Sequence, residues 1–166
     1  LMSRLIWGGR ISISVGVMAT LIALGVGLLI GLSAGFFGGA LDTFLMRIID
    51  ILMSFPYVLL AIIIIAALSP GLVNTMIALA IAGIPYYARI TRGSTLDIKE
   101  QEYVTAQEAI GSNNLRVMFK HIVPNLIAPV ITAATLDVGW MIIAAAGMSF
   151  LGLGAQPPTA EWGLML

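Results

Sequence analysis

The sequence feature that most constrains the fold is residues 11–37, ISISVGVMATLIALGVGLLIGLSAGFF, which contain no charged side chain. About 20 apolar residues in a helix are enough to cross about 30 Å of hydrocarbon. The rest of the chain is similar in character, because 60% of its residues are hydrophobic and only 10% are charged, against about 45–50% and about 25% in soluble domains. We therefore predict an all-α, polytopic transmembrane helix bundle.

Four membrane spans are expected from the apolar runs, at residues 11–37, 43–68, 72–92 and 124–147. A polar loop of residues 93–123 separates the last two. The segment SFLGLGAQPPTAEWG follows the fourth span and is rich in Gly and Pro, so it is expected to be an interfacial loop or a re-entrant segment. The sequence opens on LMSRLIWGGR, without Met at position 1 or a signal peptide, and stops on GLML, so we expect a fragment of a longer membrane domain.

The basic residues are unevenly distributed over this map, and their distribution predicts its orientation. Arg4 and Arg10 fall on one side. The six others gather on the opposite side: Arg47, Arg89, Arg92, Lys99, Arg116 and Lys120. Because Lys and Arg near span ends favour the cytoplasm, the polar loop is expected to be cytoplasmic and both ends of the chain are expected outside.

The first span contains regularly spaced small residues, and the second contains a proline. In the first span, small side chains recur at every fourth position: Ala23, Gly27, Gly31 and Gly35. This spacing either lets another helix approach closely or reflects only the frequency of glycine in membrane helices. Pro56 divides the second span, either as a functional kink or as an inert one.

The third span is expected to be interrupted at the sequence GIP of residues 83–85. It is expected to end in an interfacial aromatic and basic anchor made of Tyr86, Tyr87, Arg89 and Arg92. Asp42, just before the second span, is a candidate N-cap for it. Arg47 and Asp50 are expected to be packing or gate residues on the cytoplasmic side.

The polar loop predicts two short helices joined by a glycine turn. Asp97 and Glu100 have the spacing of a helix start, and Gly111 fits a C-terminal cap. Ser112 or Asn113 then fits the N-cap of a second helix, LRVMFKHIV. The apolar faces of the two helices are made of Tyr103, Ala106 and Ile110, and of Leu115, Met118 and Phe119. Because such faces dock in grooves of partner proteins, we expect this hairpin to bind a partner in water.

Several classes of function are excluded by what the sequence lacks. It has no Cys and a single His, which leaves no thiolate metal site, no Cys nucleophile and too few ligands for zinc. No Gly-rich loop ends in Gly-Lys-Ser/Thr, no pair of nucleophile and base is visible, and a net charge of zero gives no reason to expect nucleic acid. We therefore expect no enzyme activity, no cofactor and no metal site in this chain.

The polar loop also resembles the loop shared by permease subunits of bacterial ABC importers. In that family the pattern is Glu-Ala-Ala, three residues, Gly, nine residues, Ile, one residue and Leu-Pro. Here Thr105, Ala106 and Gln107 stand at the Glu-Ala-Ala positions, so the leading Glu and the second Ala are absent, and Gly111, His121, Val123 and Pro124 follow with the same spacing. The resemblance implies an ATPase-coupling loop formed by Tyr103, Thr105, Ala106, Gln107, Ala109, Ile110, Gly111, Leu115, His121 and Pro124.

Longer stretches resemble the dipeptide, oligopeptide and nickel branch of these permeases. They are SRLIWGGRISISVGV, GFFGGALDTFLMRIIDILMSFP, YYARITR, EYVTAQEAIG and MSFLGLGAQPPTAEWG, and they cover almost the whole chain. Members of that branch lie in the bacterial inner membrane with about six spans, which implies that the first and the last are missing here. They pair with a homologous second permease and two ATPase subunits, and they receive cargo from an extracytoplasmic solute-binding protein.

Asp137 is the one acid placed near the middle of a predicted span, where an ionisable side chain is costly and marks a candidate functional site. Trp140 and Met141 follow it one helical turn further on. These residues are expected either to line a path for cationic cargo or, for Asp137, to form a structural hydrogen bond to a partner helix. The cargo is expected to be a di- or oligopeptide, or else nickel or a metal chelate, since TLD followed by GMSFLGLG resembles nickel-type members.

Two other kinds of function are open alternatives to an ATP-driven importer. An ion-coupled secondary transporter is expected to carry several ionisable residues within its spans, whereas this chain offers Asp137 alone. Such a transporter also has no need of a large cytoplasmic hairpin. The other alternative is a non-transporting membrane scaffold or enzyme subunit, but too few polar residues converge within the spans to support catalysis.

Overall fold

The computed structural model of the protein describes residues 2–166, apart from the side chains of Ser3 and Glu108. These residues fold into helices without any strand, in the order α1 (Met2–Phe37), α2 (Gly39–Met53), α3 (Tyr57–Leu68), α4 (Leu72–Lys99), α5 (Glu102–Ala109), α6 (Asn114–Val117), the π-helical turn η1 (Met118–Ile122), α7 (Val123–Phe150) and the 3₁₀ turn η2 (Gly163–Met165). The all-α prediction is therefore confirmed.

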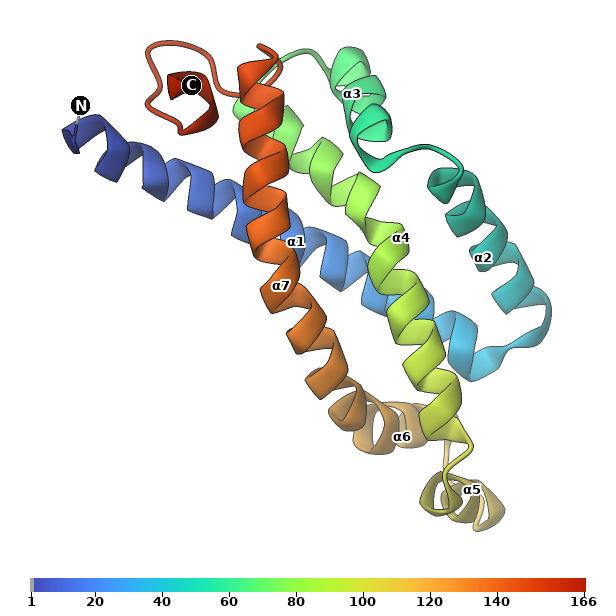
Figure 1. Ribbon diagram of the computed structural model, residues 1–166. Coiled ribbons are helices and arrows are strands. Elements are labelled where there is room, and N and C mark those ends of the chain that lie inside the picture. Colours follow the sequence, from blue (N-terminus) through green and yellow to red (C-terminus); the bar gives the residue numbers. More distant parts are fainter. Residues whose placement is uncertain (1) are drawn as a thin grey trace.

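Three long helices, α1, α4 and α7, form the body of the molecule and pack against one another (Figure 1). The helices α2 and α3 lie along the other side of α4, and α5 and α6 extend from one end of the body. Among the described residues, α1, α4 and the run from α6 to α7 are each long and apolar enough to cross a membrane. The pair of α2 and α3, which is bent by 90°, adds a fourth candidate as a broken span or a re-entrant loop. The bend lies at Ser54–Pro56, where Pro56 interrupts the predicted second span.

The tightest helix contact joins α1 to α4 through the small residues of α1. An added Cβ on Gly27 would lie 2.5 Å from Cβ of Tyr87, and one on Gly35 would lie 2.8 Å from Cβ of Thr95. No side chain fits at these separations, so glycine is required for the approach of the two backbones. Of the two interpretations of the small-residue spacing in α1, the structure supports the one in which a second helix approaches closely.

The predicted interruption of the third span at residues 83–85 is wrong, because α4 continues through Pro85 from Leu72 to Lys99. Proline removes one backbone hydrogen bond and bends a helix, but neighbouring helices can keep such a helix intact. Here Gly83 and Pro85 are buried, and the methyl group of Met141 from α7 lies close to Gly83. Packing on both sides therefore holds the helical path.

The segment that follows α7 folds back over the first turns of α1. Glu161 is only 1% exposed, and its carboxylate accepts hydrogen bonds from Ser12 Oγ at 3.0 Å and from the backbone N–H of Leu164 at 3.0 Å. Trp162 Nε1 donates to the carbonyl of Leu5 at 3.0 Å. These bonds close the end of the molecule that lies opposite α5 and α6 (Figure 1).

Candidate functional sites: a polar hairpin and a carboxylate-lined cavity

The polar loop forms a helical hairpin, but its first helix begins later than predicted. Asp97 and Glu100 do not start a helix, since α4 runs on to Lys99 and α5 begins at Glu102. The reason is that Lys99 Nζ donates to the carbonyl of Phe36 at 2.7 Å and lies 5.4 Å from the centre of the Phe36 ring. This contact satisfies a free carbonyl at the end of α1 and stabilises the last turn of α4.

The turn between α5 and α6 agrees with the predicted glycine turn. Gly111 has φ of +78°, in the region that favours glycine. Asn113 Oδ1 accepts a hydrogen bond from the backbone N–H of Leu115 at 3.1 Å, so of the two candidate N-caps the structure selects Asn113. Ser112 Oγ donates instead to Gln107 Oε1 at 3.1 Å and ties the turn to α5.

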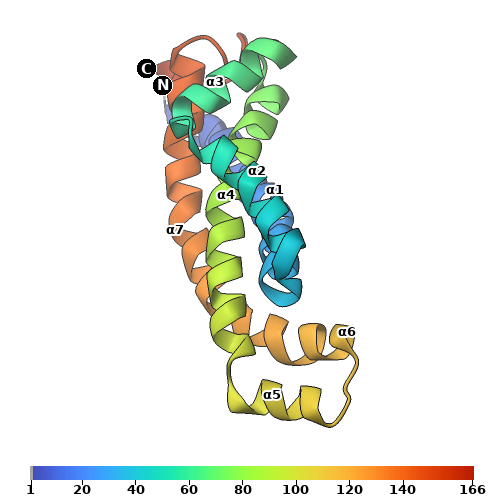
Figure 2. The same ribbon diagram turned by 90° about the vertical axis from the view of Figure 1, so that its right-hand side faces the viewer.

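The second helix of the hairpin is not separate from the span that follows. The helix α6 passes through η1, which contains His121, into α7 without a break. Pro124 lies in the first turn of α7, where its missing N–H costs little. As Figure 2 shows, α5 and α6 lie side by side at the end of the body, below α4 and α7. The hairpin is thus joined directly to two long helices.

The inner side of the hairpin is packed into the body. Val104, Val117 and Ile122 are 0% exposed and form one apolar cluster with Leu32 and Phe36 of α1. Met118 belongs to the same cluster and is only 8% exposed, so its predicted place on the outer apolar edge is wrong. The π-helical turn at this point shifts the side chains of the second helix relative to an ordinary α-helix.

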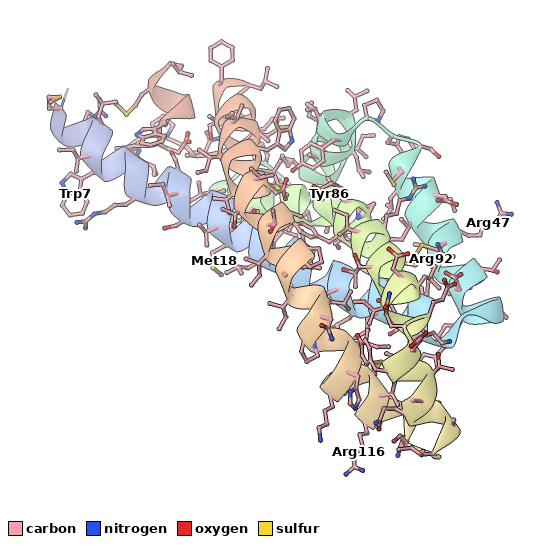
Figure 3. The ribbon with its side chains drawn as sticks, turned by 60° about the horizontal axis from the view of Figure 1, so that its bottom comes forward. Trp7, Met18, Arg47, Tyr86, Arg92 and Arg116 are labelled. Atoms are coloured by element: carbon pink, nitrogen blue, oxygen red, sulfur yellow. The ribbon has the colours of Figure 1, made fainter. Side chains whose placement is uncertain are left out.

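The outer side of the hairpin exposes large apolar side chains. Tyr103 is 44% exposed, Ile110 75%, Leu115 56% and Phe119 59%. Thr105, Ala106 and Ala109 are also exposed, whereas Gln107 and His121 are half-buried. Arg116 points away from the body (Figure 3). We call the surface of Tyr103, Ile110, Leu115 and Phe119 the hairpin apolar face.

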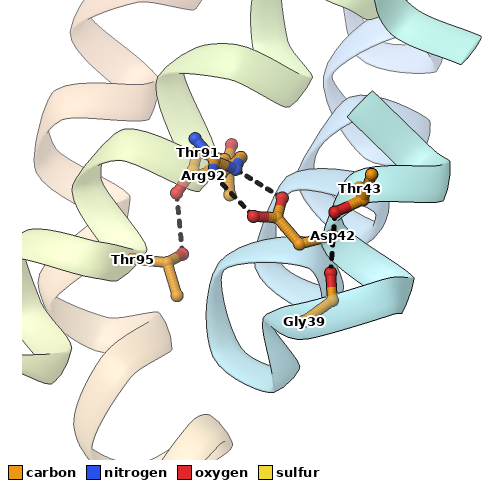
Figure 4. A network of polar contacts seen from close by, with 6 residues as sticks. All are labelled: Gly39, Asp42, Thr43, Thr91, Arg92 and Thr95. Atoms are coloured by element: carbon orange, nitrogen blue, oxygen red, sulfur yellow. Dashed lines mark hydrogen bonds and ion pairs between the residues drawn. The ribbon is translucent and has the colours of Figure 1, made fainter. Parts of the chain in front are cut away.

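Two ion pairs join α2 to α4, and one of them corrects the prediction that Asp42 caps α2. Asp42 does not cap α2, because its carboxylate binds Arg92 Nε at 2.5 Å and Arg92 Nη2 at 2.6 Å (Figure 4). Asp50 binds Arg89 at 2.6 Å. The two arginines, expected as interfacial anchors, are therefore held by α2. Tyr87, expected beside them, is fully buried. Arg47 is exposed and points away from the body (Figure 3).

The three residues expected on the cargo path, Asp137, Trp140 and Met141, line one cavity of about 250 Å³. Its other lining residues come from α3 and α4: Tyr57, Ala82, Gly83 and Tyr86. Tyr87 Oη donates to Asp137 Oδ2 at 2.7 Å, which ties α4 to α7. Sequence reasoning missed Tyr57 and expected Tyr86 and Tyr87 at the membrane interface, since the side of a helix that faces its neighbour depends on how the helices pack.

The fold is that of permease subunits of ABC transporters. Over 93% of this chain and 77% of the other, it matches a chain of the structure titled "Inward facing conformations of the MetNI methionine ABC transporter", with a TM-score of 0.82 and 20% identity. A chain from "Crystal structure of an amino acid ABC transporter with histidines" matches over 99% of this chain and 76% of its own length, with a TM-score of 0.74 and 20% identity.

Sequence comparison then defines the family. Residues 27–166 match the family described as "Binding-protein-dependent transport system inner membrane component". The chain is 46% identical, over its full length and 55% of the relative, to the "Di/tripeptide transport system permease protein DppC" of Pseudomonas aeruginosa. It is 42% identical, over 99% of its length and 54% of the relative, to the "Glutathione transport system permease protein GsiD" of Pectobacterium atrosepticum. The protein therefore belongs to this family of bacterial inner-membrane components, and the chain spans about half the length of the curated relatives it matches.

Proposed function

We propose that the protein is a membrane-spanning permease subunit of an ATP-driven ABC importer for small peptides. The fold, the family and the names of two relatives, which specify di- and tripeptides and glutathione, support this function. None of the relatives cited above is named for nickel. Among the described residues, no three His, Cys, Asp or Glu side chains come together as metal ligands would. The expectation of nickel or a metal chelate thus lacks support, and peptides are the cargo we propose.

The hairpin is proposed to couple this permease to ATP hydrolysis on a separate subunit. Its inner side is packed on α1, while the hairpin apolar face is free to enter a groove of an ATPase. The observation that carries this proposal is that α6 passes through η1 into α7 without a break, while only Glu100 and Gln101 separate α5 from α4. A displacement of the hairpin therefore reaches α7 through continuous helix and α4 through a two-residue turn.

The complete importer is proposed to contain partners besides this chain. They are a homologous second permease subunit, two ATPase subunits and an extracytoplasmic solute-binding protein. Closure of the ATPases on ATP moves the hairpins and shifts the spans from an inward to an outward state, which requires that the ATPases bind the two states with different free energies. Cargo then passes along a path that includes the cavity of Asp137, Trp140 and Met141.

The docking proposal is tested with the full-length protein and its companion subunits. The double substitution Tyr103→Asp/Ile110→Asp places charges on the hairpin apolar face and is expected to abolish co-purification of the ATPase and peptide uptake. A matched control, Gln101→Asp/Asn114→Asp, adds the same charges at exposed polar positions of the hairpin and is expected to keep both. Membrane insertion should be normal in each variant.

Normal ATPase association in the Tyr103→Asp/Ile110→Asp variant would contradict the docking proposal. Peptide uptake that continues in vesicles without ATP or without any ATPase would favour the ion-coupled secondary transporter instead. Stable assembly without uptake of any solute would favour a scaffold. Gly111→Pro, which disrupts the positive φ of the turn, provides an independent variant and is expected to uncouple the protein in the same way.

A further inference from the structure

We infer that the cavity beside Asp137 is a subsite for a primary ammonium group, the amino terminus of a peptide in transit. This inference rests on the proposed function and specifies which end of the cargo the permease recognises. The cavity has one carboxylate, three aromatic side chains and a thioether on its wall. Among the described residues, no Lys, Arg or His lines it, so its only charged group is the carboxylate, which suits a cation.

The carboxylate of Asp137 is fixed by a hydrogen bond at one oxygen, and Asp137 also lines the cavity. Its Oδ2 accepts the hydrogen bond of Tyr87, whose side chain is fully buried between the helices. The described ion pairs of the chain, Asp42 with Arg92 and Asp50 with Arg89, do not involve it. An ionised group at membrane depth is costly unless a partner of opposite charge is present. A cationic group of the cargo is such a partner.

Aromatic side chains on the cavity wall add to the attraction. Tyr86 is 47% exposed and Trp140 is 55% exposed, so part of each ring is accessible to a ligand. Ring faces attract ammonium groups within about 6 Å. Trp140 lies on the same helix as Asp137, and Tyr86 lies next to Tyr87 on α4. Together they place a carboxylate and two aromatic rings around one space.

The size of the cavity limits what it takes. Its volume of about 250 Å³ is below the range of about 300–1,000 Å³ typical of sites that enclose a whole drug-sized ligand. It therefore takes one end of a peptide rather than the whole molecule. Of the two ends, the ammonium group matches the carboxylate, while the carboxyl end would meet a like charge.

The experiment compares uptake of a dipeptide with its N-acetylated form by the complete importer in sealed vesicles. Each peptide is used at a concentration that saturates the solute-binding protein, so that differences arise after delivery. In the wild type, uptake of the free dipeptide is expected to exceed that of the acetylated form by about tenfold or more, the equivalent of one charged hydrogen bond. In Asp137→Asn, uptake of the free form should fall and the ratio should approach one.

Control variants separate recognition from structure. Asp137→Glu keeps the carboxylate and should keep most of the preference. Tyr87→Phe keeps the ring but removes the donor to Asp137, and should reduce the ratio in part. Asp97→Asn makes the same acid-to-amide change at an exposed position on α4 and should leave the ratio unchanged. The amount of assembled transporter is measured for each variant.

Two results would overturn the inference while leaving the importer intact. They are a wild-type ratio near one, and an equal loss of both peptides in Asp137→Asn, which would assign the Asp137–Tyr87 hydrogen bond a purely structural role. If Asp137→Asn fails to assemble, the test depends on Asp137→Glu and Tyr87→Phe. In these variants, an equal loss of uptake for the free and the acetylated dipeptide likewise overturns the inference. Absence of ATP-dependent uptake of either peptide by the wild type would instead overturn the proposed function and this inference with it.

Discussion

The two faces of α4 are attached to their neighbours in different ways. Against α1, the backbones approach so closely that Gly27, Gly31 and Gly35 leave no room for a side chain. Against α2, the described polar contacts are the ion pairs of Arg89 and Arg92, in which the side chain of Arg89 is 52% exposed and that of Arg92 33% exposed. The first contact depends on shape over many atoms, while the second depends on charges near solvent. We conclude that close backbone packing holds α1 to α4, whereas charge contributes to holding α2 to α4.

The largest effect is expected from filling the contact of α1 with α4. In Gly31→Leu, the new Cβ would lie 2.7 Å from Cβ of Thr91 and would also meet the carbonyl of Ala88. Overpacking costs about 1–3 kcal/mol and occasionally more, and here the obstacle includes backbone that cannot rotate away. We expect a loss near the upper end of this range, about 3 kcal/mol, measured as the thermal unfolding midpoint of the purified full-length protein.

The matched control for this change lies on the same helix. At Gly25, an added Cβ meets nothing within 4 Å, so Gly25→Leu is expected to leave the midpoint nearly unchanged. Equal destabilisation by both substitutions would mean that replacing glycine affects the helix α1 itself, and that the close approach of α1 to α4 contributes little to stability.

A smaller effect is expected from the ion pair of Asp42 with Arg92. Asp42→Asn removes the charge but keeps the shape, and the pair is bidentate and partly shielded, with side chains 18% and 33% exposed. We expect a loss of about 1 kcal/mol, the upper value for pairs near the surface. The charge-swapped variant Asp42→Arg/Arg92→Asp should recover part of that stability. A double-mutant cycle without coupling would contradict the role assigned to these charges.

The smallest effect is expected from Asp50→Asn. The pair of Asp50 with Arg89 has side chains 49% and 52% exposed, and exposed pairs contribute about 0.2–1 kcal/mol. We expect a loss below about 0.5 kcal/mol. Because about 1 M salt reduces the screening length to about 3 Å, the effects of Asp42→Asn and Asp50→Asn should shrink in salt. The effect of Gly31→Leu should not, and equal salt dependence in all three would remove the distinction between the two faces.

Features that depend on neighbouring residues could be predicted from the sequence. The all-α bundle follows from uninterrupted apolar runs, and the close approach of α1 follows from the glycine spacing. The hairpin follows from Gly111 and Asn113, whose turn and cap are determined within a few residues. Asp137 was identified because an acid in an apolar run can be recognised from the sequence, whichever side of the helix it lies on.

Features that depend on how helices pack could not be predicted. Tyr87 was expected at an interface because it precedes basic residues, but the rotation of α4 against the glycines of α1 turns it inward. Asp42 was expected as a cap, but its partner Arg92 is distant in the sequence. The continuity of α4 through Pro85 likewise comes from the helices on either side rather than from the proline itself.

The buried carboxylate of Glu161 sets an order on assembly. Its donor Ser12 is made early and Glu161 stands 149 positions later in the chain, so their hydrogen bond cannot form until every intervening helix has left the ribosome. A buried carboxylate is costly without hydrogen-bond donors, and here Ser12 and the backbone N–H of Leu164 provide them. The segment that follows α7 can therefore pack in this way only after the helices between Ser12 and Glu161 have been made.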